Sequence, residues 1–76
     1  MEGGDALQHP EKEGVVLFFL NTLDNAVFAR RLGVSVQTLC RLYRGTRRMS
    51  RSVRREALSA VGVTEEEFSF LVSKIA

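Results

Sequence analysis

The residues with the clearest chemistry are nine arginines that lie between positions 30 and 55. No aspartate or glutamate lies within that stretch, whereas the rest of the chain carries two lysines and all nine acidic residues. Like charges at this density repel one another, and binding to a polyanion relieves the repulsion. A guanidinium group also forms paired hydrogen bonds to phosphate and to guanine. The sequence therefore predicts a basic surface that binds a polyanion, with an ordinary solvated surface as the alternative.

The residues that could support catalysis are few. The chain has one histidine, His9, and one cysteine, Cys40, which has no general base beside it. An activated nucleophile needs such a base, and a metal site needs several ligands. We therefore expect no enzyme activity, no metal or other cofactor and no small-molecule ligand. A lone cysteine also excludes an internal disulfide, which favours a reducing, cytoplasmic location.

A chain of 76 residues has room for one domain. Residues 1–9 are polar and glycine-rich and are expected to form a flexible tail, so that residues 10–76 form the folded domain. A core this small gives marginal stability, which favours a homodimer. The longest apolar run, residues 15–20, is far shorter than the roughly 18 residues that a membrane span needs.

Hydrophobic spacing predicts an all-α fold with five short helices. The first should begin at Pro10, end near Thr22 and bury Val16, Phe19, Leu20 and Leu23, although a buried strand over residues 15–20 remains an alternative. The later helices are expected to begin after capping side chains and to end at glycines. The expected caps are Asp24, Ser35, Ser50 and the pair Thr64 and Glu67, and the expected stops are Gly33, Gly45 and Gly62.

The stretch from Asn25 to Gly45 predicts two helices that meet at a steep angle across the turn Gly33-Val34-Ser35. Five apolar residues have the spacing to fill the corner between them, namely Phe28, Leu32, Val34, Leu39 and Leu42. Ala29 is small, as a close crossing of two helices requires. These features together indicate a helix-turn-helix, with an ordinary helix pair in a small bundle as the alternative.

The helix from about Val36 to Arg44 should present one face to a partner. At 100° per residue, that face carries Val36, Gln37, Cys40, Arg41 and Arg44. Gln37 can form paired hydrogen bonds to adenine, Arg41 can do so to guanine, and Val36 and Cys40 offer apolar contact to a thymine methyl. Alternatively, Gln37 is an ordinary solvated residue and Arg41 contacts a phosphate.

The arginines after this helix are better placed for the nucleic-acid backbone. We expect phosphate contacts from Arg44, Arg47, Arg48 and Arg51, and also from Arg54 and Arg55, which should share a helix face with Arg51. If about six phosphates are neutralised per subunit, log affinity should fall with log salt at a slope near −5.

The pattern AxxLGVSxxTLxxLxxG, from Ala29 to Gly45, resembles the helix-turn-helix of the lambda-repressor-like (Cro/C1-type) DNA-binding domain family. The stretch VGVTEEEF, residues 61–68, is similar to the family's approach to its fifth helix. The resemblance implies a five-helix domain that binds double-stranded DNA as a homodimer at near-palindromic operators, as a repressor-like transcriptional regulator. It places Val36, Gln37 and Arg41 at base-reading positions.

The same resemblance implies two further roles. Asn25 falls at the start of the second helix, where the family often has a polar side chain that braces the reading helix and touches phosphate. The last helix often mediates dimer contacts, which would involve Phe68, Phe70, Leu71 and Ile75, although these residues also suit the core.

Two other functions remain open from the sequence. The basic face suits a protein-interaction module, such as an antitoxin-like or anti-repressor partner that binds an acidic protein. RNA binding is the other possibility, but single-stranded RNA usually stacks on exposed aromatic side chains, and Tyr43, at the end of the reading helix, is expected to be buried.

Overall fold

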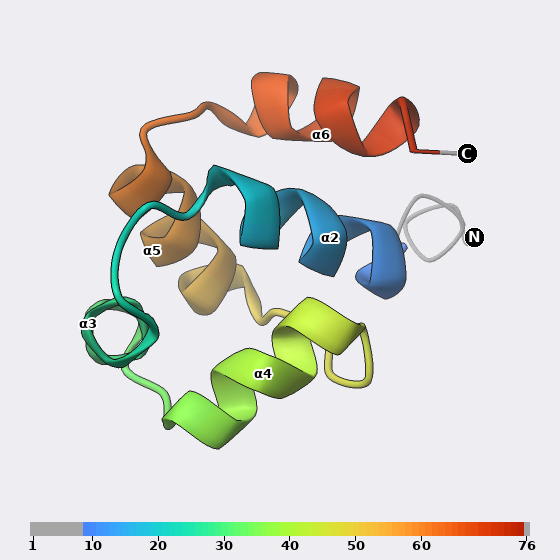
Figure 1. Ribbon diagram of the computed structural model, residues 1–76. Coiled ribbons are helices and arrows are strands. Elements are labelled where there is room, and N and C mark those ends of the chain that lie inside the picture. Colours follow the sequence, from blue (N-terminus) through green and yellow to red (C-terminus); the bar gives the residue numbers. More distant parts are fainter. Residues whose placement is uncertain (1–8, 76) are drawn as a thin grey trace.

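The structure, a computed structural model, describes residues 9–75 as five α-helices joined by short connections (Figure 1). The helices are α2 (Pro10–Leu20), α3 (Asn25–Leu32), α4 (Val36–Arg44), α5 (Arg51–Val61) and α6 (Glu65–Ser73). No residue from 9 to 75 lies in a strand, so the all-α prediction is confirmed and the strand alternative for residues 15–20 is wrong. Residues 1–8, most of the expected tail, lie outside the described residues, as does residue 76.

The starts of α3 to α6 follow from the capping residues that the sequence predicted. Asp24, Ser35 and Ser50 each accept a hydrogen bond from a backbone N–H in the first turn of the helix that follows. Thr64 and Glu67 form the expected capping box, in which each side chain accepts from the other residue's backbone N–H. These bonds satisfy N–H groups that have no partner within the helix, so local sequence is enough to place each start.

Helix α2 differs from its prediction in both length and buried face. It ends at Leu20 rather than near Thr22, and Phe19, which was expected to point inward, is 77% exposed. The buried residues are Glu13, Gly14, Val16 and Leu17. Every residue from 15 to 20 is apolar, so the pattern alone does not set the rotation of the helix. No helix within residues 9–75, α2 included, is long and apolar enough to cross a bilayer.

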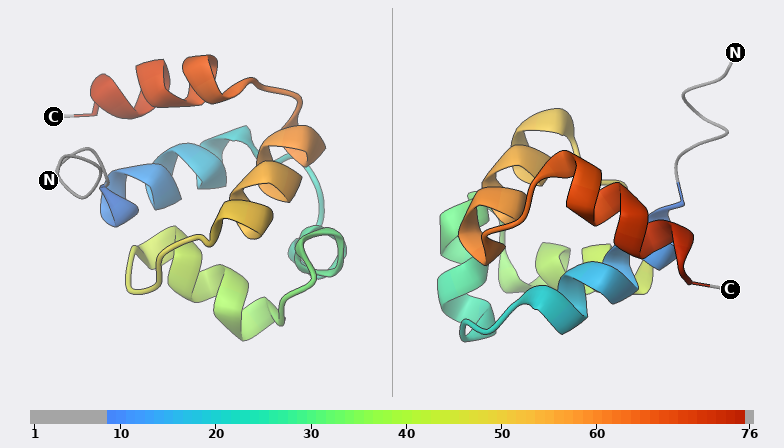
Figure 2. Two further views of the ribbon diagram at one scale, coloured as in Figure 1. Left: turned by 180° about the vertical axis from the view of Figure 1, so that it is seen from behind. Right: turned by 90° about the horizontal axis from the view of Figure 1, so that it is seen from above.

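Helix α2 lies at the centre of the fold, between α6 and α4, and the view from behind shows α5 crossing this stack (Figures 1 and 2). A first core cluster joins α2 to α3, α4 and α5, and its Leu17, Phe28 and Leu39 are 0% exposed. A second cluster attaches α6 to α2 and α5. Its buried members are Val16, Leu58, Phe68 and Val72. Because each fully buried large apolar side chain contributes about 1.5–3 kcal/mol, the first cluster holds the inner face of α4 in place.

Candidate nucleic-acid interface

Helix α4 has one buried face and one exposed face. Leu39 and Leu42 are 0% and 3% exposed and belong to the first core cluster. On the other side Gln37 and Arg41 are exposed, and so are Val36, which is 43% exposed, and Arg44. Cys40 is only half-buried rather than fully exposed, so its thiol is less accessible than its neighbours on this face. The exposed face of α4 thus presents three side chains that can form paired hydrogen bonds, namely Gln37, Arg41 and Arg44.

The connection between α3 and α4 sets how this face is oriented. Gly33 has a φ of 73°, in the left-handed region that glycine adopts without steric cost, and it ends α3. Ser35 then caps α4 by accepting from the backbone N–H of Thr38. Ala29 is 2% exposed, which agrees with the need for a small side chain where α3 packs in the core. A connection this short leaves little freedom for α4 to turn relative to α3.

Eight arginines are exposed in the described part of the chain. They come from the last turn of α3, from α4, from the loop that follows α4 and from the first half of α5. They are Arg30, Arg31, Arg41, Arg44, Arg47, Arg48, Arg51 and Arg55, and we call them the exposed arginines. All the arginines expected to contact phosphate belong to this set except Arg54.

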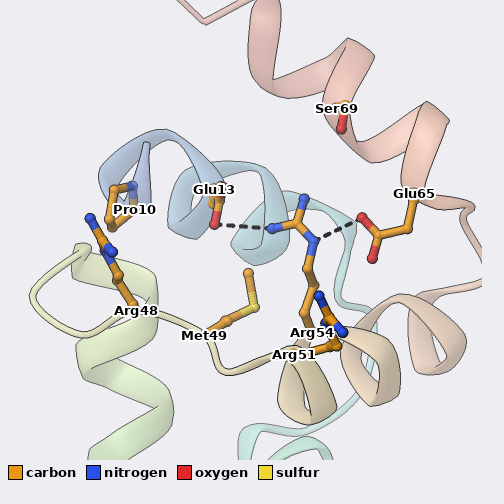
Figure 3. Close-up of a pocket in the computed structure, with 8 residues that line it drawn as sticks. All are labelled: Pro10, Glu13, Arg48, Met49, Arg51, Arg54, Glu65 and Ser69. Carbon is orange, nitrogen blue, oxygen red and sulfur yellow. Dashed lines mark hydrogen bonds and ion pairs between the residues drawn. The ribbon is translucent and has the colours of Figure 1, made fainter. Parts of the chain in front are cut away.

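The ninth arginine, Arg54, departs from the expectation that the arginines have no acidic partner. Its Nη1 lies 3.3 Å from Oε1 of Glu13 in α2, and its Nε donates to Oε1 of Glu65 in α6 at 2.8 Å. Figure 3 shows the two carboxylates approaching the guanidinium group from opposite sides. Arg54 therefore does not share an anion-binding face with Arg51. Its charge is already neutralised by Glu13 of α2 and Glu65 of α6.

The surroundings of Arg54 favour its charged form. Burial alone would lower the pKa of Arg54, but the hydrogen bond to Glu65 and the charge of Glu13 outweigh it, so the pKa is raised. The guanidinium carbon also lies 4.9 Å from the ring centroid of Phe68, a favourable cation–π contact. Arg54 is thus part of the packing of α6 onto α2 and α5.

Tyr43, near the end of α4, lies between two asparagines. Its hydroxyl oxygen accepts from Nδ2 of Asn21 at 3.1 Å, and its hydroxyl donates to Oδ1 of Asn25 at 3.3 Å. Its ring meets the ring of Phe18 edge to face, with centroids 5.2 Å apart. Tyr43 is half-buried, not fully buried as the sequence suggested. These contacts join the end of α2, the start of α3 and the end of α4.

Sequence reasoning assigned Asn25 a bracing role only through the resemblance, and it assigned Asn21 none. No local signal identifies the pair, because Asn21 and Tyr43 are 22 residues apart and meet only when α2 packs on α4. Asn21 lay inside the helix predicted from the sequence, and only the structure, in which α2 ends at Leu20, places it directly after the helix end.

The residues proposed for a dimer contact divide between core and surface. Phe68 is 0% exposed, so it belongs to the core and is not available to a second copy. Leu71 and Ile75 are partly buried against the second core cluster. Phe70 is 59% exposed, with the ammonium group of Lys74 lying 4.9 Å from its ring centroid. Of the four, Phe70 is the most accessible.

Residues that could hold a metal do not gather in the described part of the chain. Within residues 9–75 no three histidine, cysteine, aspartate or glutamate side chains are grouped closely enough to hold an ion. His9 is exposed just before α2, and Cys40 is a free thiol on α4.

No protein-family model matches the chain, and the searches of curated proteins and of solved structures gave no match either. The interface described above therefore depends on the geometry of α3, α4 and the exposed arginines alone.

Proposed function

We propose that this chain is a sequence-specific double-stranded DNA-binding domain in which α3 and α4 form a helix-turn-helix and α4 lies in the major groove. The observation that supports this most strongly is the exposure of Gln37 and Arg41 on one side of a helix whose other side is held in the core. A helix supported in this way can present its side chains to base edges without losing its own packing. The resemblance to the Cro/C1-type family supports a repressor-like regulator of transcription.

In this proposal the base contacts come from the exposed face of α4. Gln37 bonds adenine and Arg41 bonds guanine, each through two hydrogen bonds, and Val36 contacts a thymine methyl group. Cys40 contributes less, because it is half-buried. Each bidentate pair discriminates between bases by about 1–3 kcal/mol, which is enough to select a short half-site.

The phosphate contacts come from both sides of α4. Arg44, Arg47, Arg48 and Arg51 supply charge after α4, Arg55 can add to them, and Asn25 contributes a neutral contact at the start of α3. Arg54 is excluded because it bonds Glu13 and Glu65. With about five phosphates neutralised per subunit, log affinity should fall with log salt at a slope of about −4.5.

The resemblance also supports a homodimer on a near-palindromic operator. The residues available for the contact are the exposed Phe70 and the partly buried Leu71, both in α6, and the partly buried Ile75 just after it. In such a dimer the two copies of α4 would lie about 34–36 Å apart, one turn of the double helix.

The test is equilibrium binding of the chain to a random duplex and to tRNA over a series of salt concentrations. We expect duplex binding with a slope near −4.5 for each bound subunit. Arg47→Gln and Arg51→Gln should each reduce the magnitude of the slope by about 1. Lys74→Gln, directly after α6, removes the same charge away from the proposed surface and should leave the slope unchanged.

Three results would contradict the proposal. Binding confined to tRNA would indicate an RNA-binding domain, and a nearly flat salt titration would exclude binding through arginine–phosphate contacts. No binding to either nucleic acid would favour the protein-interaction alternative.

A further inference from the structure

The side chain of Asn21 is held in a single orientation by the backbone of Leu23. Its Oδ1 accepts from the backbone N–H of Leu23 at 2.9 Å, and its Nδ2 donates to the backbone C=O of the same residue at 3.0 Å. Turning the amide over would set oxygen against oxygen and N–H against N–H. The second hydrogen of Nδ2 is therefore always directed at the hydroxyl oxygen of Tyr43, 3.1 Å away.

This orientation decides where the hydroxyl hydrogen of Tyr43 goes. A phenol has one hydrogen to donate, and here its oxygen already accepts from Asn21. The hydrogen is then directed to Oδ1 of Asn25 at 3.3 Å. The ring cannot swing freely, because it packs against Phe18 at an interplanar angle of 86°.

The carbonyl oxygen of Asn25 is thus engaged on the side that faces Tyr43. Its amide nitrogen has no hydrogen-bond partner among residues 9–75, and Asn25 is exposed at the start of α3. Two N–H donors remain for a partner outside the chain. An amide in the opposite orientation would instead present an oxygen, which a phosphate oxygen repels.

We infer that the chain of hydrogen bonds from Asn21 through the Tyr43 hydroxyl to Asn25, which we call the asparagine–tyrosine relay, holds the Asn25 amide so that its N–H donors meet a phosphate of bound DNA. Tyr43 and Asn21 are positioning residues in this arrangement, because they act on the phosphate only through Asn25. The inference rests on the proposed function. It gives Asn21 and Tyr43 a part in DNA binding, although neither residue reads a base or carries a charge.

The relay is tested by the affinity of single and double variants for a random duplex, at a temperature where circular dichroism shows every variant folded. Tyr43→Phe keeps the ring and removes the hydroxyl, and Asn25→Ala removes the amide. Each should weaken binding by about three- to tenfold, the usual net contribution of one hydrogen bond. The double variant should bind no more weakly than Asn25→Ala, because the hydroxyl acts through Asn25.

Two further variants separate orientation from folding. Asn25→Asp keeps an acceptor for the Tyr43 hydroxyl but replaces the donors with a negative charge. The Asn25→Asp variant should therefore bind the duplex more weakly than the Asn25→Ala variant. Its free energy of unfolding should be at least as large as that of Asn25→Ala. Ser73→Ala removes a hydroxyl from α6, where it donates to the backbone C=O of Phe70, and should leave binding unchanged.

The outcomes distinguish the relay from the proposed function. If the unmodified chain does not bind duplex DNA, both are wrong. If it binds and Tyr43→Phe binds equally well, only the relay is wrong. The relay is also contradicted if Tyr43→Phe weakens binding by the same factor in the Asn25→Ala variant as in the unmodified chain.

Discussion

Tyr43 is the only tyrosine of a chain that has no tryptophan, so its ionisation can be followed by itself. Burial raises the pKa of the Tyr43 hydroxyl, the hydrogen bond from Asn21 opposes that shift, and the nearby Cys40 adds to it. A group whose pKa is raised on folding binds its proton more tightly in the folded state. Tyr43 therefore adds stability below its unfolded pKa of about 10 and loses that contribution as the pH rises through the folded pKa.

Ultraviolet titration of the phenolate should show this shift directly. We expect the midpoint for the folded chain to lie above that of the same chain in urea, which should be about 10 for an exposed tyrosine. In the same pH range the free energy of unfolding should fall, and Tyr43→Phe should lack that part of the decrease. A folded-state midpoint at or below the midpoint in urea would show that the hydroxyl is not buried as described.

Single residues differ in how far the sequence could predict their surroundings. The exposure of Gln37 and Arg41 was predictable, because the spacing of apolar residues within one helix decides it. The ion pairs of Arg54 were not predictable from the sequence, because Glu13 and Glu65 belong to other helices. The burial of Phe68 beneath Arg54 depends on the same packing of α6, so its exclusion from a dimer contact also required the structure.

Among the helices, the caps of α3 to α6 were predictable but the rotation of α2 was not. Capping depends on a few neighbouring residues, whereas the buried face of an apolar helix depends on what packs against it. Gly14 shows what α2 packs against. A β-carbon at this position would overlap the backbone carbonyl oxygens of Leu42 and Tyr43, so the glycine allows α2 to approach the end of α4 closely.

Gly14→Ala should therefore destabilise the fold even though alanine favours helix formation. Overpacking of this kind costs about 1–3 kcal/mol, and each kcal/mol lowers the melting temperature of a domain this small by about 4–8 °C. The measurement is thermal unfolding followed by circular dichroism.

Gly62→Ala is the matched control for Gly14→Ala. A β-carbon at Gly62 meets nothing within 4 Å, and only its φ of 78° disfavours alanine. Its cost should be about 1 kcal/mol, without any separation of α2 from α4. If Gly14→Ala were no more harmful than Gly62→Ala, the close approach of α2 to α4 would be wrong.

Within residues 9–75, the helices and the loop that carry the exposed arginines contain one acidic residue, Glu56 in α5. The exposed arginines belong to α3, α4, the following loop and α5, whereas Glu65, Glu66 and Glu67 occupy the first turn of α6. The net charge of +2 therefore understates the field near α4. Such a distribution attracts a polyanion to the arginine-bearing side and repels it from the start of α6.

The most direct test of the central claim, that the exposed face of α4 reads bases, compares two arginines on two DNA duplexes. One duplex is selected by the chain from a randomised pool, and the other is random. We expect Arg41→Ala to weaken binding to the selected duplex by about tenfold or more, with a much smaller effect on the random one. Arg47→Ala should weaken binding to both duplexes by the same factor. Equal losses on the two duplexes for Arg41→Ala would contradict base reading by α4.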